Sequence, residues 1–174
     1  MYLLEEIKKI IENNSKKIAI FVDMDGVVAD YRFGEGENIK SNKPELYLNK
    51  RPIYTTINNL QRINEEIDCE MFILSSCLYK EQAEEKSLWL DKYMPFIKEK
   101  NIIFVLSQNF ESRKKIKIDK IREKLNSNEC ELAILIDDTH DILFLALSEL
   151  KEKIIPFHVI TLIDWGRKLR WNMM

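Results

Sequence analysis

The chain has 174 residues, of which 45% are hydrophobic, and this composition suits one domain with a packed core rather than a disordered protein. Its 27 basic and 29 acidic residues give a net charge of −2, so the overall charge favours neither nucleic acid nor an anionic membrane as a partner. Three scattered cysteines without a CxxC pair, and no apolar run near the roughly 20 residues of a membrane helix, lead us to expect a cytoplasmic protein.

Five short apolar runs alternate with amphipathic stretches along the chain. Helical spacing of apolar residues predicts helices over residues 2–13, 56–67, 80–93, 112–126 and 141–151. The apolar runs are residues 18–22, 71–74, 102–106, 132–136 and 157–161. Continuous apolar runs are typical of parallel strands that are buried on both faces. The alternation therefore predicts an α/β fold, a three-layer Rossmann-like parallel sheet of about five strands.

Residues 30–54 interrupt this alternation. They contain two aromatic residues, Tyr31 and Phe33, among loop-forming glycine, asparagine and proline residues, and a stretch this long without clear structure is usually functional. We predict a single domain over residues 1–174, with a small cap or lid at residues 30–54 beyond the end of the first strand. The two aromatic rings fit either of two roles, stacking on a base or sugar or packing as the cap's own core.

Acidic and hydroxyl side chains follow three of the five predicted strands, at the edge where parallel α/β sheets bind ligands. They are Asp23 and Asp25 after the first strand, Ser75 and Ser76 after the second, and Asp137 and Asp138 after the fourth. Each pair alone also fits a turn or a helix cap, and it is their coincidence at one edge that favours a site. Four carboxylates there would repel one another, so either their pKa values are raised or a cation lies among them. Oxygen ligands without nearby cysteine or histidine favour Mg²⁺ over zinc.

Three stretches resemble the motifs of the haloacid dehalogenase (HAD) superfamily. Phe21–Asp30 is similar to the first motif, hhDxDGh, Phe72–Ser75 to the second, and Ile134–Asp138 to the fourth. Within the superfamily the chain resembles the 5′(3′)-deoxyribonucleotidases, whose Arg-Pro-Ile and Glu-Lys-x-x-Trp patterns are similar to Arg51–Ile53 and Glu85–Trp89. It departs from them at residues 107–110, where the nucleotidases carry basic residues close to the substrate.

This resemblance implies a HAD-type phosphatase, a Mg²⁺-dependent phosphomonoester hydrolase with a deoxyribonucleoside monophosphate as its candidate substrate. Asp23 would attack phosphorus and form an aspartyl-phosphate, and Asp25 would act as general acid and base. A small phosphorylated substrate is then the expected partner, with no nucleic acid and no membrane.

The remaining site residues follow from the same resemblance. Phosphate binding is assigned to Ser75, Ser76 and Lys86, and metal binding to Asp23, the Asp25 backbone carbonyl, Asp137 and Asp138. The third-motif lysine has two candidates, because Lys114 lies in a basic run ahead of the fourth strand, where many superfamily members carry this lysine.

Three other functions fit parts of the pattern. A HAD phosphatase for a sugar phosphate or another small phosphomonoester would use the same motifs. A non-catalytic HAD-like binding module is less consistent, because both Asp23 and Asp25 are retained. A signalling receiver domain would carry its phosphoacceptor aspartate after the third strand, where this chain has Ser107. The C-terminal Trp165–Trp171 mixes aromatic and basic residues, and a helix that docks on the domain is favoured over nucleic-acid contacts.

Overall fold

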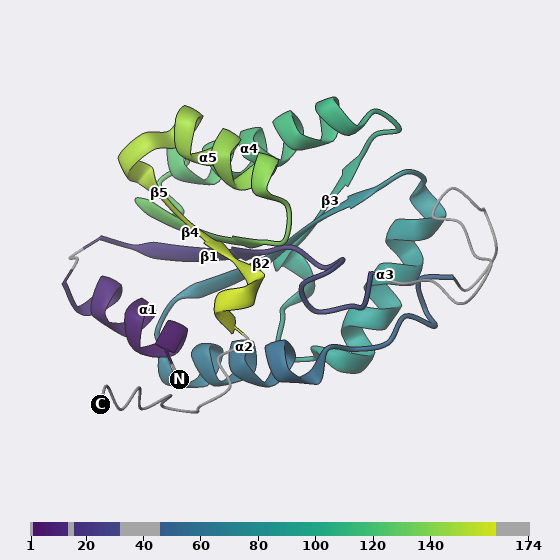
Figure 1. The fold of residues 1–174 in the computed structure, drawn as a ribbon, viewed down its shortest axis with the longest axis horizontal. Coiled ribbons are helices and arrows are strands. Elements are labelled where there is room, and N and C mark those ends of the chain that lie inside the picture. The colour runs from purple at the N-terminus through teal and green to yellow at the C-terminus, as the bar shows by residue number, and fades with distance from the viewer. Residues whose placement is uncertain (1, 14–15, 32–45, 163–174) are drawn as a thin grey trace, which may run out of the picture.

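A parallel five-stranded sheet is the centre of the molecule (Figure 1). The computed structural model describes residues 2–13, 16–31 and 46–162. The sheet order is β3-β2-β1-β4-β5, and every neighbouring pair of strands is parallel. The strands are β1 (Ile18–Val22), β2 (Glu70–Cys77), β3 (Ile102–Leu106), β4 (Leu132–Asp137) and β5 (Ile154–His158). The predicted three-layer α/β fold is confirmed.

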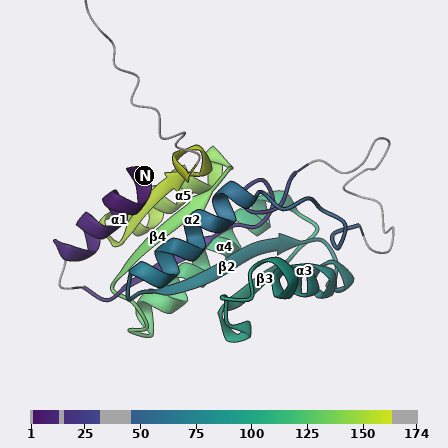
Figure 2. The same cartoon turned by 90° about the horizontal axis from the view of Figure 1, so that it is seen from below.

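Helices cover both faces of the sheet. In Figure 1, α4 and α5 lie above the strands and α1, α2 and α3 below them, and Figure 2 shows α1 and α2 in front of the sheet. The helices are α1 (Tyr2–Glu12), α2 (Tyr54–Glu66), α3 (Lys80–Tyr93), α4 (Phe110–Asn126) and α5 (His140–Leu150). Three short 3-10 turns, η1 (Glu99–Asn101), η2 (Lys151–Lys153) and η3 (Val159–Leu162), complete the described elements.

Strand β1 separates two hydrophobic cores. All five of its residues are buried, and Ile18, Ile20 and Val22 belong to the core that α1, α2 and α3 cover. Ala19 and Phe21 belong to the second core, which α4 and α5 cover. Because successive side chains of a strand point to opposite faces, a strand between two cores must be apolar at every position. This is the physical origin of the continuous apolar run at residues 18–22.

The chain order of the strands creates a crevice at the carboxyl end of β1. The chain passes from β1 to β2 on one side, and β4 later pairs with β1 on the other. Open α/β sheets bind ligands at such switch points, beyond the carboxyl ends of the strands. Asp23 directly follows β1, and Asp137 is the last residue of β4, so the fold brings both residues to this edge of the sheet.

The segment after β1 leaves the sheet and returns to nearly the same place. Ala29 and Pro52 form an antiparallel bridge, the Asp30 amide donates to Arg51 O at 2.8 Å, and the Ile53 amide donates to Val28 O at 2.7 Å. These contacts close the base of the predicted cap at residues 30–54. Most of that cap, with Phe33, lies outside the described residues, as does the C-terminal Trp165–Trp171, so both remain predictions.

Across the described ranges, no helix combines the length and the apolar character that crossing a membrane requires.

Candidate active site

The loop after β1 packs tightly against the residues that follow β4. The carbonyl oxygen of Met24 accepts hydrogen bonds from the amides of Val28 and Ala29, both at 2.9 Å, which turns the chain back on itself. Gly26 has a φ of +76°, and a Cβ atom there would lie 2.3 Å from an Asp138 carboxylate oxygen. Glycine is therefore required both by the backbone conformation and by the close approach of this carboxylate.

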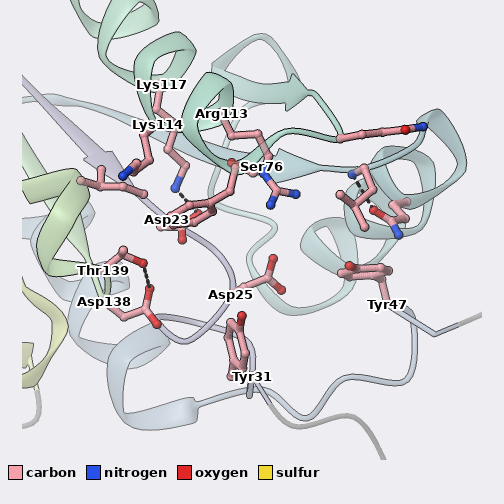
Figure 3. A pocket seen from close by; sticks show the side chains of 15 residues that line it. Asp23, Asp25, Tyr31, Tyr47, Ser76, Arg113, Lys114, Lys117, Asp138 and Thr139 are labelled. Atoms are coloured by element: carbon pink, nitrogen blue, oxygen red, sulfur yellow. Dashed lines mark hydrogen bonds and ion pairs between the residues drawn. The ribbon is translucent and has the colours of Figure 1, made fainter. Parts of the chain in front are cut away.

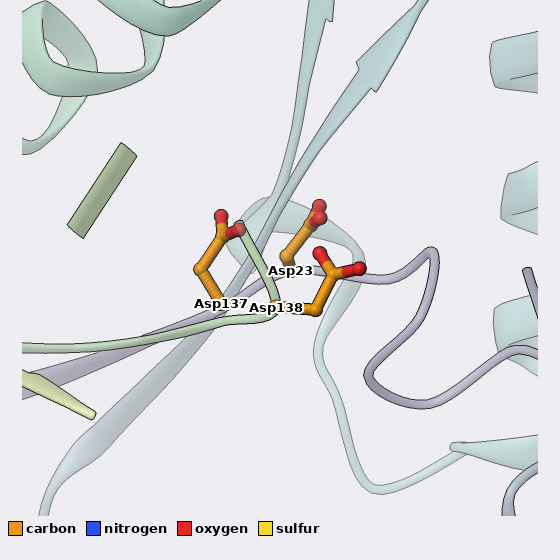
Figure 4. A group of neighbouring side chains, drawn as sticks. All are labelled: Asp23, Asp137 and Asp138. Carbon is orange, nitrogen blue, oxygen red and sulfur yellow. The ribbon is translucent and has the colours of Figure 1, made fainter. Parts of the chain in front are cut away.

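Three carboxylates from two strand ends form an acidic centre (Figure 4). Each of Asp23, Asp137 and Asp138 offers an oxygen, and these oxygens lie within 4.8 Å of one another. Asp137 is fully buried and Asp23 is 7% exposed. The Lys117 ammonium, from α4, lies 2.9 Å from Asp23 Oδ1 and 3.0 Å from Asp137 Oδ2. One cation thus faces three clustered carboxylates, which leaves an excess of negative charge.

This donor set fits a hard divalent cation. Its potential ligands are all oxygen atoms, the set that Mg²⁺ prefers in proteins. Asp23 Oδ1 is buried and lacks a hydrogen bond of proper geometry, although Lys117 is within ion-pair distance. A buried carboxylate oxygen that is left without a hydrogen bond is costly, and a bound cation would satisfy it.

Burial and charge shift the pKa values of the acidic centre. Burial raises the pKa of Asp23 to about 6, with smaller upward effects from Asp137 and Asp25, while Lys117 opposes the rise. Burial, followed by the charge of Asp23, also raises the pKa of Asp138. Burial alone would lower the pKa of Lys117, but Asp23 and Asp137 outweigh it and raise that pKa. The protein therefore holds this cluster at an electrostatic cost, which a divalent cation would reduce.

Asp25 lies in a different electrostatic environment. Lys50 Nζ lies 2.5 Å from its Oδ1, and Lys86 Nζ lies 2.5 Å from its Oδ2. Burial would raise the pKa of Asp25, but Lys86 and Lys50 together lower it to about 2. Two carboxylates only two residues apart are thus shifted in opposite directions. Such a separation of pKa values is typical of paired groups with different chemical tasks.

The predicted site residues meet at the carboxyl edge of the sheet. Besides the acidic centre and Asp25, the second strand brings its two serines there, since Lys86 Nζ contacts Ser75 Oγ at 3.0 Å and Ser76 O at 2.7 Å. The chemical roles assigned to these residues stay predictions.

The lysine that contacts Asp23 is neither of the two candidates predicted from the sequence, Lys86 and Lys114. Lys86 contacts Asp25 rather than Asp23. Lys114 pairs with Glu111 at 2.8 Å and Asp141 at 3.5 Å at the pocket wall. The lysine that contacts Asp23 is Lys117, which sequence reasoning did not single out. One signal was present, because Lys117 has helical spacing with the buried Ile121 and therefore belongs to the inward face of α4.

A pocket of about 240 Å³ opens above these groups (Figure 3). Carboxylates of Asp23, Asp25 and Asp138 form part of its wall. Aromatic rings and cations form a further part, namely Tyr31, Tyr47 and Phe110 with Arg113, Lys114 and Lys117. The guanidinium of Arg113 is directed into the pocket, and its Cζ lies 5.7 Å from the centre of the Phe110 ring. Among the described carboxylates, none forms an ion pair with Arg113, so this cation is available to an anionic ligand.

Residues 37–149 match the model of a protein family described as 5′ nucleotidase, deoxy (pyrimidine), cytosolic type C protein. No curated protein sequence matches the chain.

Among the solved structures that share the fold, two illustrate the likeness. One, in the Pnkp1/Rnl/Hen1 RNA repair complex, has a TM-score of 0.58 and 14% identity over 83% of this chain. This chain covers 43% of that protein, less than half of its length. The other, a haloacid dehalogenase-like hydrolase from Burkholderia xenovorans LB400, has a TM-score of 0.51 and 12% identity, with 80% of each chain covered.

Proposed function

Because the chain belongs to the type C family of cytosolic 5′-nucleotidases, which are HAD-type phosphatases, we propose that it hydrolyses small phosphomonoesters with Mg²⁺ as cofactor. Deoxyribonucleoside 5′-monophosphates are the first candidate substrates. The observation that carries the proposal is the buried Asp23 beside Asp137, Asp138 and Lys117 at the carboxyl edge of the sheet. This arrangement suits a nucleophilic carboxylate that meets a phosphoryl group next to a divalent cation.

In the first step an oxygen of Asp23 forms a bond to phosphorus, and the bond from phosphorus to the leaving oxygen breaks. Asp25 gives a proton to the leaving oxygen and, in the second step, takes one from the water that hydrolyses the aspartyl-phosphate. Ser75, Ser76 and the ammonium of Lys86 hold the phosphoryl oxygens. When Lys86 binds the phosphoryl group, it gives up one of the two contacts that keep Asp25 ionised, so Asp25 can carry the proton that it must donate.

Asp23, Asp137, Asp138 and the backbone carbonyl of Asp25 are the proposed ligands of Mg²⁺. A bound Mg²⁺ would offset the repulsion between these carboxylates and the negatively charged phosphoryl group. Lys117 remains in contact with Asp23 and keeps its carboxylate oriented toward the pocket.

Metal removal gives a direct test. We expect the protein to release p-nitrophenol from p-nitrophenyl phosphate in Mg²⁺, and chelation with EDTA to reduce the rate at least about 100-fold. Added Mg²⁺ should restore the rate. Activity that is unaffected by EDTA after dialysis would contradict the proposed metal dependence.

A substrate panel then distinguishes the proposed substrate class from its alternative. Deoxyribonucleoside 5′-monophosphates should have a higher kcat/KM than sugar phosphates of similar size. The alternative, a sugar phosphate or another small phosphomonoester, is favoured by one feature, the absence of basic residues at 107–110. A preference for sugar phosphates in the panel would reject the nucleotide and leave the phosphatase chemistry in place.

Arg113 is expected to contribute to substrate binding. The Arg113→Ala variant should raise KM about tenfold with little change in kcat, because a hydrogen bond between charged groups contributes about 1.4 kcal/mol or more. Arg122→Ala is the matched control, since Arg122 lies on the same helix and pairs with Asp119 and Glu149 instead. Equal KM values for the two variants would show that Arg113 does not contact the substrate.

A further inference from the structure

Lys50 is a buried lysine that pairs with the carboxylate of Asp25. Its side chain is 1% exposed, and its ammonium lies 2.5 Å from Asp25 Oδ1. The residues that line the pocket include Asp25 but neither Lys50 nor Lys86. Each Asp25 oxygen therefore has its own buried ammonium. The Lys50 ammonium also lies near the rings of Tyr31 and Tyr47, which both line the pocket.

The position of Lys50 is fixed by three groups around it. Its carbonyl oxygen accepts a hydrogen bond from Trp89 Nε1 at 2.9 Å, which ties the backbone to α3. Its ammonium lies 5.0 Å from the centre of the Tyr47 ring, and the Lys86 ammonium lies 4.9 Å from the same ring. The next residue, Arg51, accepts the Asp30 hydrogen bond that closes the base of residues 30–54. Lys50 is thus held firmly relative to the loop that carries Asp25.

Lys86 makes polar contacts besides the one with Asp25. Lys86 also contacts Ser75 Oγ and Ser76 O, so it lies next to the residues proposed to hold the phosphoryl group. It can exchange Asp25 Oδ2 for a phosphoryl oxygen. Lys50 contacts the other carboxylate oxygen, Oδ1. Asp25 then has one anchored oxygen and one oxygen that faces the reaction.

We propose that Lys50 is a positioning residue, which anchors Asp25 Oδ1 so that Oδ2 delivers the proton to the leaving group. The inference rests on the proposed phosphatase function. In the step concerned, an Asp23 oxygen bonds to phosphorus, and the bond between phosphorus and the leaving oxygen breaks with its electron pair on that oxygen. The proton on Asp25 Oδ2 passes to the leaving oxygen, and Lys50 neither gains nor loses a proton.

The dependence of the rate on the leaving group tests this role. A nitrophenolate departs without protonation, whereas an alkoxide needs a proton as it leaves, and a positioned general acid contributes about 10²–10⁴-fold. We expect Lys50→Met to lower kcat/KM for an alkyl phosphate such as glycerol 2-phosphate about 100-fold, and that for p-nitrophenyl phosphate less than about fivefold. The ratio of the two values does not depend on how much of the variant is folded.

Lys92→Met is the matched control, because Lys92 is an exposed lysine that also lies over a tyrosine ring, that of Tyr93 at 4.9 Å. Its ratio should equal that of the wild type. If Lys50→Met lowered kcat/KM equally for both substrates, the proposal would be overturned. Such a result would mean that Lys50 contributes to folding or to binding of the phosphoryl group. Failure of the phosphatase function itself would appear separately, as wild-type protein without activity on either substrate.

Discussion

The Asp23→Asn variant should lose phosphatase activity by about 10⁴-fold or more, the size of effect that removal of a nucleophile produces in other enzymes. The amide cannot form the aspartyl-phosphate, while the pocket and its cations keep their shape. The measurement is the steady-state rate with p-nitrophenyl phosphate in Mg²⁺. Asp91→Asn, an exposed position on α3, is the control and should retain the wild-type rate. Activity unchanged in Asp23→Asn would reject the mechanism.

The same variant should be more stable than the wild type when metal is absent. Burial raises the pKa of Asp23 to about 6, above the value of about 4 expected in the unfolded chain. The folded state therefore binds the proton more tightly, and the metal-free protein loses stability as the pH rises from about 4 to about 6. At pH 7 the ionised carboxylate costs on the order of 2 kcal/mol, which the neutral amide avoids.

Thermal denaturation in EDTA measures this effect. At pH 7 the Tm of Asp23→Asn should exceed that of the wild type by about 4–8 °C, and the difference should disappear near pH 4. Added Mg²⁺ should raise the wild-type Tm more than that of the variant, because the variant lacks one proposed ligand. A lower Tm for Asp23→Asn at pH 7 would mean that the pair with Lys117 outweighs the cost of burial.

The Lys117→Met substitution should strongly reduce both the activity and the stability of the protein. The ammonium is 2% exposed and contacts Asp23 and Asp137, so its removal leaves two buried carboxylates without their cation. Breaking a buried ion pair in this way costs about 3–5 kcal/mol. We expect a fall in the Tm of the metal-free protein and a loss of kcat of about 10³-fold, because the developing charge at phosphorus loses a fixed counter-charge.

A comparison within one helix tests the assignment of this lysine. Lys114→Met should have a much smaller effect on kcat than Lys117→Met, since Lys114 pairs with Glu111 and Asp141 at the pocket wall. Lys115→Met, at an exposed position between them, should match the wild type in both rate and Tm. A larger loss of kcat in Lys114→Met than in Lys117→Met would instead identify Lys114 as the third-motif lysine.

The fold was predictable from the sequence because burial on both faces forces strands to be apolar throughout. The position of the fifth strand was predicted too late in the chain. Residues 157–161 were expected to form it, and Ile154–His158 forms it instead. Proline within a run argues against a strand, and Pro156 is accepted here because β5 is an edge strand that pairs only with β4. The residues from Val159 to Leu162 form a 3-10 turn instead.

The acidic residues of the site were predictable, whereas most of its cations were not. A carboxylate that directly follows a strand is placed by the sheet, as Asp23 and Asp137 are. A lysine reaches a site through a long side chain from a helix or loop, so its partner depends on how that element packs. Lys117 reaches Asp23 from the inward face of α4, and Lys50 reaches Asp25 from a segment without regular secondary structure.

The closed base of residues 30–54 has an evolutionary consequence. Ala29 pairs with Pro52 and Asp30 with Arg51, so the chain leaves the domain after Asp30 and rejoins it at Arg51 through one closed base. The contacts of this base do not depend on the length of the stretch between Tyr31 and Leu46, so we expect that length to vary among related proteins. The returning residues Tyr47 and Lys50, however, contact the groups around Asp25, so changes at these two positions would alter the surroundings of the proposed general acid.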